Sequence, residues 1–207
     1  MTELASNQKE ISHARNWKGY LFTYRSYTPI PFLVIMVLLA SPTALSLVIG
    51  FVVAVSGEAI RLWGVSYAGS ETRTTGTVGG TQLVTSGPYA HVRNPLYIGN
   101  ILMYLGVGIM SNALVPWLQL IALTYFVLQY AAIISLEEEY LKQTFENWGN
   151  YSSSVLRFIP RLKKFRGADN LVANLPRALR SERSSLIALI SLTVLLLALY
   201  VFLRGGV

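Results

Sequence analysis

The chain has 207 residues, 53% of them hydrophobic and only 13% charged, which is about half the charged share of a soluble domain. This composition argues against a water-soluble globule. The formal charge of +7 is carried by residues that flank apolar segments, which argues against a nucleic-acid-binding domain. Because there is no cysteine, disulfides, thiolate catalysis and cysteine-based metal sites are excluded. The two histidines, His13 and His91, are far apart in sequence, and we expect no metal site.

Residues 1–28 are polar and aromatic, and we expect an interfacial segment at the membrane surface, with a partly ordered tail as the alternative. They contain no early apolar core, so no cleavable signal peptide is expected. The first apolar block, from Pro31 to Trp63, would be roughly 50 Å long as one helix, whereas the hydrocarbon core is about 30 Å thick. We therefore predict a tight turn at Ser41-Pro42 between two helices.

A polar loop rich in glycine and threonine, Ala68 to His91, precedes the rest of the apolar sequence. The elements that follow are predicted to be an apolar helix over 96–110, a turn at 111–112, an apolar helix over 114–136, a charged helical stretch over 137–156, a basic linker over 157–183 and a last apolar helix over 186–203. The prediction is an all-α integral membrane protein with about five transmembrane helices. Its three units are the interfacial segment (1–28), a membrane core (29–165), and a basic linker with an extra helix (166–207).

The distribution of basic residues predicts the orientation of these helices. With the N-terminus in the cytoplasm, sixteen of the 17 lysines and arginines lie on the cytoplasmic side, and only Arg204 lies opposite. The long polar segments lie on this side too, whereas the turns on the other face are too short to form a site. We therefore expect a multi-pass protein whose N-terminus and active site are cytoplasmic.

The start of the helix over 96–110 has the chemistry of an anion site. Pro95 suits the first helical turn, where its missing N–H is no loss, and Asn94 is the predicted N-cap. Arg93 and the loop amides then lie at a helix N-terminus, which favours an anionic group such as a carboxylate. The alternative is a membrane-boundary helix start with a snorkelling arginine. Arg93 and Asn94 are the candidate catalytic residues.

Carboxylates at the membrane boundary form a second candidate cluster. Glu137, Glu138 and Glu139 follow an apolar helix directly, where charges are costly unless they are solvated or paired. One of them could bind a ligand cation, or all three could lie on a solvated helix face. Glu58 and Arg61 are three residues apart and are expected to pair on one helix face as a structural contact.

These pieces together resemble the isoprenylcysteine carboxyl methyltransferase and phospholipid methyltransferase family of integral membrane enzymes. Its first block corresponds to LVTSGPYAHVRNPLYIG at residues 83–99. Its second block is matched by glutamates, a leucine and spaced aromatic, valine and proline positions, at Glu137, Glu138, Leu141, Phe145, Tyr151, Val155 and Pro160. The resemblance covers roughly residues 30–165, so the membrane core is expected to be a methyltransferase core.

The resemblance implies S-adenosyl-L-methionine as cofactor, bound between the loop and a C-terminal amphipathic helix. Tyr97 would lie over the cofactor, and Glu137 would pair with its amino group, beside Glu138. The positions implied to line the cofactor from the loop are Gln82, Tyr89, Ala90, His91 and Val92. The enzyme would then transfer a methyl group to a lipophilic or membrane-associated acceptor, namely a carboxylate, an amine or a thiol.

The chain departs from the family pattern at several positions. Asn94 occupies the place of the family histidine, and Glu146 that of a glycine. Ile133 stands where prenylcysteine-specific members carry an arginine for the substrate carboxylate, which disfavours prenylcysteine as acceptor. The helix over 186–203 has no assigned counterpart, and the sequence leaves the acceptor and the oligomeric state open.

Two other classes of protein compete with this reading. A membrane reductase of the steroid-reductase type would share the helical layout and bind a nicotinamide cofactor instead. A small membrane transporter or scaffold would place polar groups in mid-membrane, where this chain has little beyond Gln119 and Gln129.

Overall fold

The computed structural model describes residues 17–69 and 82–205, and all the regular elements there are helical, which confirms the predicted all-α class. The twelve residues 70–81 of the glycine- and threonine-rich loop lie outside the described residues, as does most of the predicted interfacial segment. The helices are α2 (Trp17–Tyr24), α3 (Ile30–Leu38), α4 (Ala44–Ala68), η2 (Gly87–Ala90), α5 (Pro95–Ser111), α6 (Trp117–Thr144), α7 (Trp148–Ser154) and α8 (Leu175–Gly205).

Three of the described helices, α4, α6 and α8, are long and apolar enough to cross a membrane. The apolar helix α5 has 17 residues and α3 has nine, against the roughly 20 residues that a perpendicular crossing needs. The chain is therefore a multi-pass membrane protein, and the count of five spans stays a prediction. The tight turns at 41–42 and 111–112 lie where the sequence predicts, and Ser41 N–H donates to the Ser111 carbonyl at 2.9 Å.

Glycines spaced seven residues apart bring α4 and α5 into close contact. On α4 these are Gly50 and Gly57, and they face Gly106 and Gly99 on α5. A Cβ at Gly57 would lie 2.6 Å from the Gly99 carbonyl oxygen, and one at Gly106 would lie 2.4 Å from the nitrogen of Ala54. Small residues at such spacing let membrane helices pack backbone to backbone, so this pair is the central contact of the fold.

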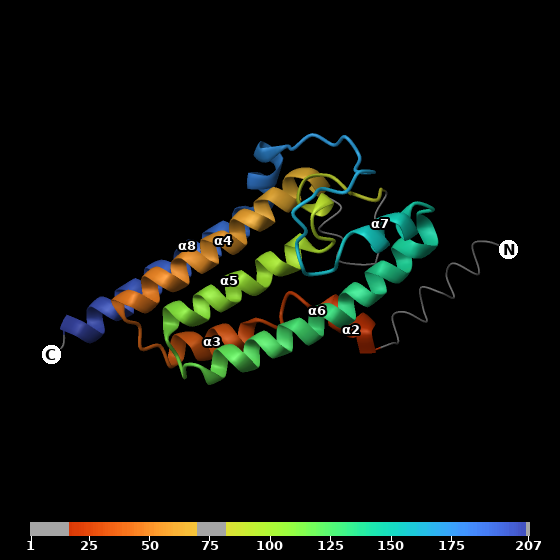
Figure 1. Ribbon diagram of the computed structural model, residues 1–207. Coiled ribbons are helices and arrows are strands. Elements are labelled where there is room, and N and C mark those ends of the chain that lie inside the picture. The colour runs from red at the N-terminus through yellow and green to blue at the C-terminus, as the bar shows by residue number, and fades with distance from the viewer. Residues whose placement is uncertain (1–16, 70–81, 206–207) are drawn as a thin grey trace.

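The helices are arranged around α5, with α4 and α8 on one side and α3 and α6 on the other (Figure 1). An aromatic cluster fills the space between α5 and α6, where the Tyr104 and Phe126 rings stack at 4.7 Å and Tyr97 and Tyr130 lie 4.6 Å apart. The loop before α5, the C-terminal end of α6 and the N-terminal end of α8 meet at one end of the molecule (Figure 1).

Helix α8 begins earlier than expected, at Leu175 instead of residue 186, so the predicted basic linker is partly helical. The start is determined by Asn174, whose side-chain oxygen accepts a hydrogen bond from Arg177 N–H at 3.0 Å, with Pro176 in the first turn. The Asn174 N–H donates to the Ser66 carbonyl at 2.8 Å. The charged residues before the apolar run are thereby attached to the end of α4.

The segment after α7 folds back over the loop that precedes α5. Arg161 N–H donates to the His91 carbonyl at 3.0 Å, and Phe165 N–H donates to the Ala90 carbonyl at 2.9 Å. Further along, Asp169 accepts hydrogen bonds from the Thr85 N–H and hydroxyl at 2.8 and 3.1 Å. The segment from Arg161 to Asp169 therefore packs against the loop.

Candidate functional site

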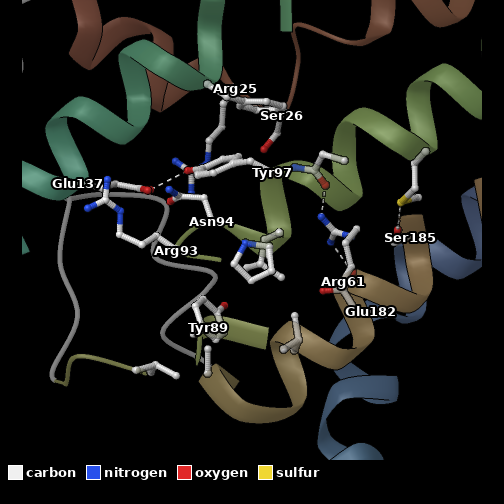
Figure 2. Close-up of a pocket in the computed structure, with 18 of the residues that line it drawn as sticks. Arg25, Ser26, Arg61, Tyr89, Arg93, Asn94, Tyr97, Glu137, Glu182 and Ser185 are labelled. Carbon is white, nitrogen blue, oxygen red and sulfur yellow. Dashed lines mark hydrogen bonds and ion pairs between the residues drawn. The ribbon is translucent and has the colours of Figure 1, made fainter. Parts of the chain in front are cut away.

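A cavity of about 760 Å³ lies where the loop, α5, α6 and α8 meet, and α2 closes it from another side. Figure 2 shows Glu137, Tyr97 and Arg25 on one side of this cavity and Arg61, Glu182 and Ser185 on the other. Five of the eight residues implied by the family resemblance line it, namely Gln82, Tyr89, Tyr97, Glu137 and Glu138, and the candidate catalytic residues Arg93 and Asn94 line it too.

Glu137 is held in one orientation by Tyr97. The Tyr97 hydroxyl donates to Glu137 Oε1 at 2.7 Å, and the Tyr97 ring is supported by Tyr130. The Arg25 guanidinium lies 4.0 Å from the Phe22 ring centroid and lines the same part of the cavity. A fixed carboxylate beside aromatic rings favours a cationic ligand group.

Glu138 has a different role, because it joins two arginines. Arg93 Nη2 lies 3.2 Å from Glu138 Oε1, while Arg157 donates to Glu138 Oε2 at 2.6 and 2.9 Å. Arg93 also donates to the Ser152 carbonyl at 2.9 Å. These contacts hold α7 and the segment after it against the start of α5. One donor of the arginine, Arg93 Nε, is buried and makes no hydrogen bond within the described part of the chain.

Asn94 is the N-cap residue of α5, as the sequence predicts, but its side chain makes no capping hydrogen bond. The expected cap is replaced because the Asn94 amide donates instead to the Arg157 carbonyl at 3.3 Å. Tyr89 lines the cavity, its carbonyl accepts from the Tyr151 hydroxyl at 2.8 Å, and burial raises the pKa of its phenol, which keeps it neutral.

Three of the implied loop positions, Ala90, His91 and Val92, are not among the residues that line the cavity. Ala90 and Val92 are buried, and Ala90 packs with Trp148 and its neighbours. His91 Nδ1 lies 2.8 Å from the Arg161 carbonyl oxygen, so this nitrogen is the donor. These residues hold the loop in place, and the ring of His91 is oriented by the segment that covers it.

The opposite wall holds a charged cluster that sequence reasoning missed as a site. Arg61 of α4 pairs with Glu182 of α8 and donates to Asn100 of α5. The expected pairing of Glu58 with Arg61 is present, with 3.6 Å between Arg61 Nε and Glu58 Oε2. The Ser185 hydroxyl donates to the same Glu58 oxygen at 2.9 Å.

Both glutamates of this cluster are buried, with 3% of Glu58 and 1% of Glu182 exposed. The sequence contained one signal for it. Glu182 and Ser185 are three residues apart, just before an apolar run, and therefore lie on one helix face. What it did not contain is the pairing across 121 residues between Arg61 and Glu182.

Two curated proteins are similar to parts of the chain. The chain is 37% identical over 107 residues to the cobalt-zinc-cadmium resistance protein CzcN of Cupriavidus metallidurans, a match that covers 52% of the chain and 45% of that protein. It is 37% identical over 86 residues to the nickel-cobalt-cadmium resistance protein NccN of Alcaligenes xylosoxydans xylosoxydans, covering 42% of the chain and 39% of that protein. The chain thus spans less than half the length of these curated relatives. No solved structure matches the chain.

Within residues 17–69 and 82–205, no three histidine, cysteine, aspartate or glutamate side chains gather as a metal site would require. The family comparison is more informative about function. The model of the phospholipid methyltransferase family matches residues 45–147, which include the loop motif, Tyr97 and Glu137. Through this segment the chain belongs to the phospholipid methyltransferase family of membrane methyltransferases.

Proposed function

We propose that the protein transfers a methyl group from S-adenosyl-L-methionine to a lipophilic or membrane-associated acceptor, whose nucleophile is a carboxylate, an amine or a thiol. The observation that carries the proposal is the Glu137 carboxylate, oriented by Tyr97 in a large cavity at the family motif. The positive-inside distribution of lysine and arginine supports a cytoplasmic cofactor entrance.

The residues present fit this cofactor in three respects. The cavity volume of about 760 Å³ is within the roughly 300–1,000 Å³ of small-molecule sites. Glu137 would hold the amino group, and the unsatisfied Nε of Arg93 offers a donor for the carboxylate. The rings of Tyr97, Tyr104 and Tyr130 provide the aromatic faces that stabilise a cation such as a sulfonium.

When bound, S-adenosylmethionine supplies a methyl group that is already activated for displacement by its positive sulfur. The chain therefore has to orient the acceptor, hold the two reactants in line and exclude water. A carboxylate or thiolate acceptor needs no catalytic base. His91 is not placed to act as one, because its ring is outside the cavity lining and its Nδ1 is bonded to the Arg161 carbonyl.

Calorimetric titration of the detergent-purified protein with S-adenosylmethionine tests the proposal. We expect micromolar binding, weakened more than tenfold by Glu137→Gln. Glu139→Gln is the matched control, because Glu139 is exposed on the same helix and does not line the cavity. Equal effects of the two variants would remove Glu137 from the site. Binding of a reduced nicotinamide in place of S-adenosylmethionine would support the reductase alternative.

A further inference from the structure

The cavity continues well beyond Glu137, along one face of α5. Its lining on that helix includes Asn100, Met103, Tyr104 and Val107. Val107 lies ten residues beyond Tyr97, or about 15 Å at 1.5 Å per residue. The cavity is therefore deep enough to hold a second ligand next to the group bound at Glu137.

The far part of the cavity changes from polar to apolar with depth. At the level of Arg61 it is lined by Asn100, Glu182 and Ser185. Deeper in the membrane region the lining is Leu33, Val107, Ala188, Leu189 and Leu192. A polar group followed by a hydrocarbon chain matches this order of side chains.

Helix α8 forms one side of both the polar part and the apolar part of this region of the cavity. Its inward residues recur every three or four positions, as expected for one helix face, at Glu182, Ser185, Leu189, Leu192 and Leu196. Its opposite face is apolar and exposed, with 61% of Ile190 and 60% of Val194 accessible, as suits a lipid-facing surface. The helix lies outside the segment that the family model matches, residues 45–147.

The buried ion pair between Arg61 and Glu182 determines how α8 is placed. A buried pair is costly to misalign, because a shift of the helix would separate two charges that are shielded from solvent. Ser185, one turn further on, bonds to Glu58 and adds a second fixed point. The residues that follow on the same face, Ala188 and Leu192, are thereby directed into the cavity.

We propose that α8 determines acceptor specificity: together with α5 it holds the hydrocarbon chain of a membrane amphiphile, whose polar end lies at the cluster of Arg61, Asn100, Glu182 and Ser185. The inference deepens the proposed function and rests on it. The amphiphile's reactive group then lies on the Glu137 side of the cavity, and its chain follows Val107, Leu189 and Leu192.

The absence of native cysteine allows a clean test by site-specific modification. Ala188→Cys places a thiol in the cavity lining, and Ile190→Cys places one on the lipid-facing side of the same helix. Each variant is treated with benzyl methanethiosulfonate, which adds a bulky apolar group. Two probes carrying a diazirine on the hydrocarbon chain, a fatty acid and a phosphatidylglycerol, are then photolysed with the protein in phosphatidylglycerol nanodiscs.

We expect at least one probe to label Leu189, which lines the cavity and is only 5% exposed. Modification at position 188 should lower this labelling at least fivefold and leave S-adenosylmethionine binding unchanged, whereas modification at position 190 should alter neither. Labelling confined to outward residues such as Ile190 and Val194, or equal effects at both positions, would overturn the inference. If the unmodified protein did not bind S-adenosylmethionine, the result would instead contradict the proposed function.

Discussion

Two walls of the cavity contain the same kinds of charged side chain in different surroundings. The loop wall holds Arg93 and Glu138, and the α8 wall holds Arg61 and Glu182. On the loop wall, Glu138 is shared by Arg93 and Arg157, and the Arg157 side chain is 48% exposed. On the α8 wall, Glu182 is 1% exposed and pairs with Arg61 between helices. Solvent and salt can replace the contact of Arg157 with Glu138, whereas the pair of Arg61 with Glu182 is shielded from both. We therefore expect the outer part of the loop wall to adjust to a ligand more readily than the α8 wall.

Both walls depend on the contact between α4 and α5, so its disruption should have the largest effect. Gly57→Leu would force the helices apart, because even a Cβ there lies 2.6 Å from the Gly99 carbonyl oxygen. We expect no folded protein in detergent by size-exclusion chromatography. Gly149→Leu is the control, since a Cβ at Gly149 meets nothing within 4 Å. Normal folding of the Gly57 variant would show that the walls do not share this support.

Glu182→Ala should have the next largest effect, because it leaves Arg61 without its partner on α8. The expected loss is about 3 kcal/mol, at the lower end for breaking a buried pair, since Glu58 still lies near Arg61. Thermal unfolding in detergent measures it. The triple variant Glu58→Gln, Arg61→Leu and Glu182→Leu should recover part of the loss, because no buried charge of the cluster is then left alone. If Glu182→Ala lowered the free energy of unfolding by less than the roughly 1 kcal/mol of an exposed ion pair, the two walls would not differ.

Tyr97→Phe tests the loop-side part of the cavity without removing a charge. The variant loses the hydrogen bond to Glu137, which is worth roughly 1.5–3 kcal/mol when one partner is charged. We expect about tenfold weaker S-adenosylmethionine binding by calorimetry. Tyr125→Phe is the control, because Tyr125 packs on Phe32 and does not line the cavity. Unchanged affinity in Tyr97→Phe would mean that the orientation of Glu137 does not matter for binding.

Arg157→Ala should have the smallest effect. Its pair with Glu138 is partly exposed, and Arg93 remains to hold the carboxylate, so the stability change is expected to stay within about 1 kcal/mol. Added salt should shrink the difference between wild type and variant in thermal unfolding. A loss as large as that of Glu182→Ala would show that the loop wall is as rigid as the α8 wall.

Much of the fold could be predicted because its signals are local. Apolar runs too long for one crossing, with turns at 41–42 and 111–112, placed the helices within a few residues. The motif around Tyr97 and Glu137 led to two side chains that the structure joins by a hydrogen bond. The error at the start of α8 arose because basic residues were taken as linker, whereas Asn174 and Pro176 start a helix there.

The amino-acid sequence by itself determined the all-helical membrane class, the family motif and the carboxylates at the helix end, because each depends on composition or on spacing along one segment. Only the tertiary structure decided that Ala90, His91 and Val92 support the loop without lining the cavity, since this depends on the chain that folds back over them. The pairing of Glu182 with Arg61 likewise became known only from the tertiary structure. Buried charges are stabilised by partners, and partners distant in sequence are known only once the helices are packed.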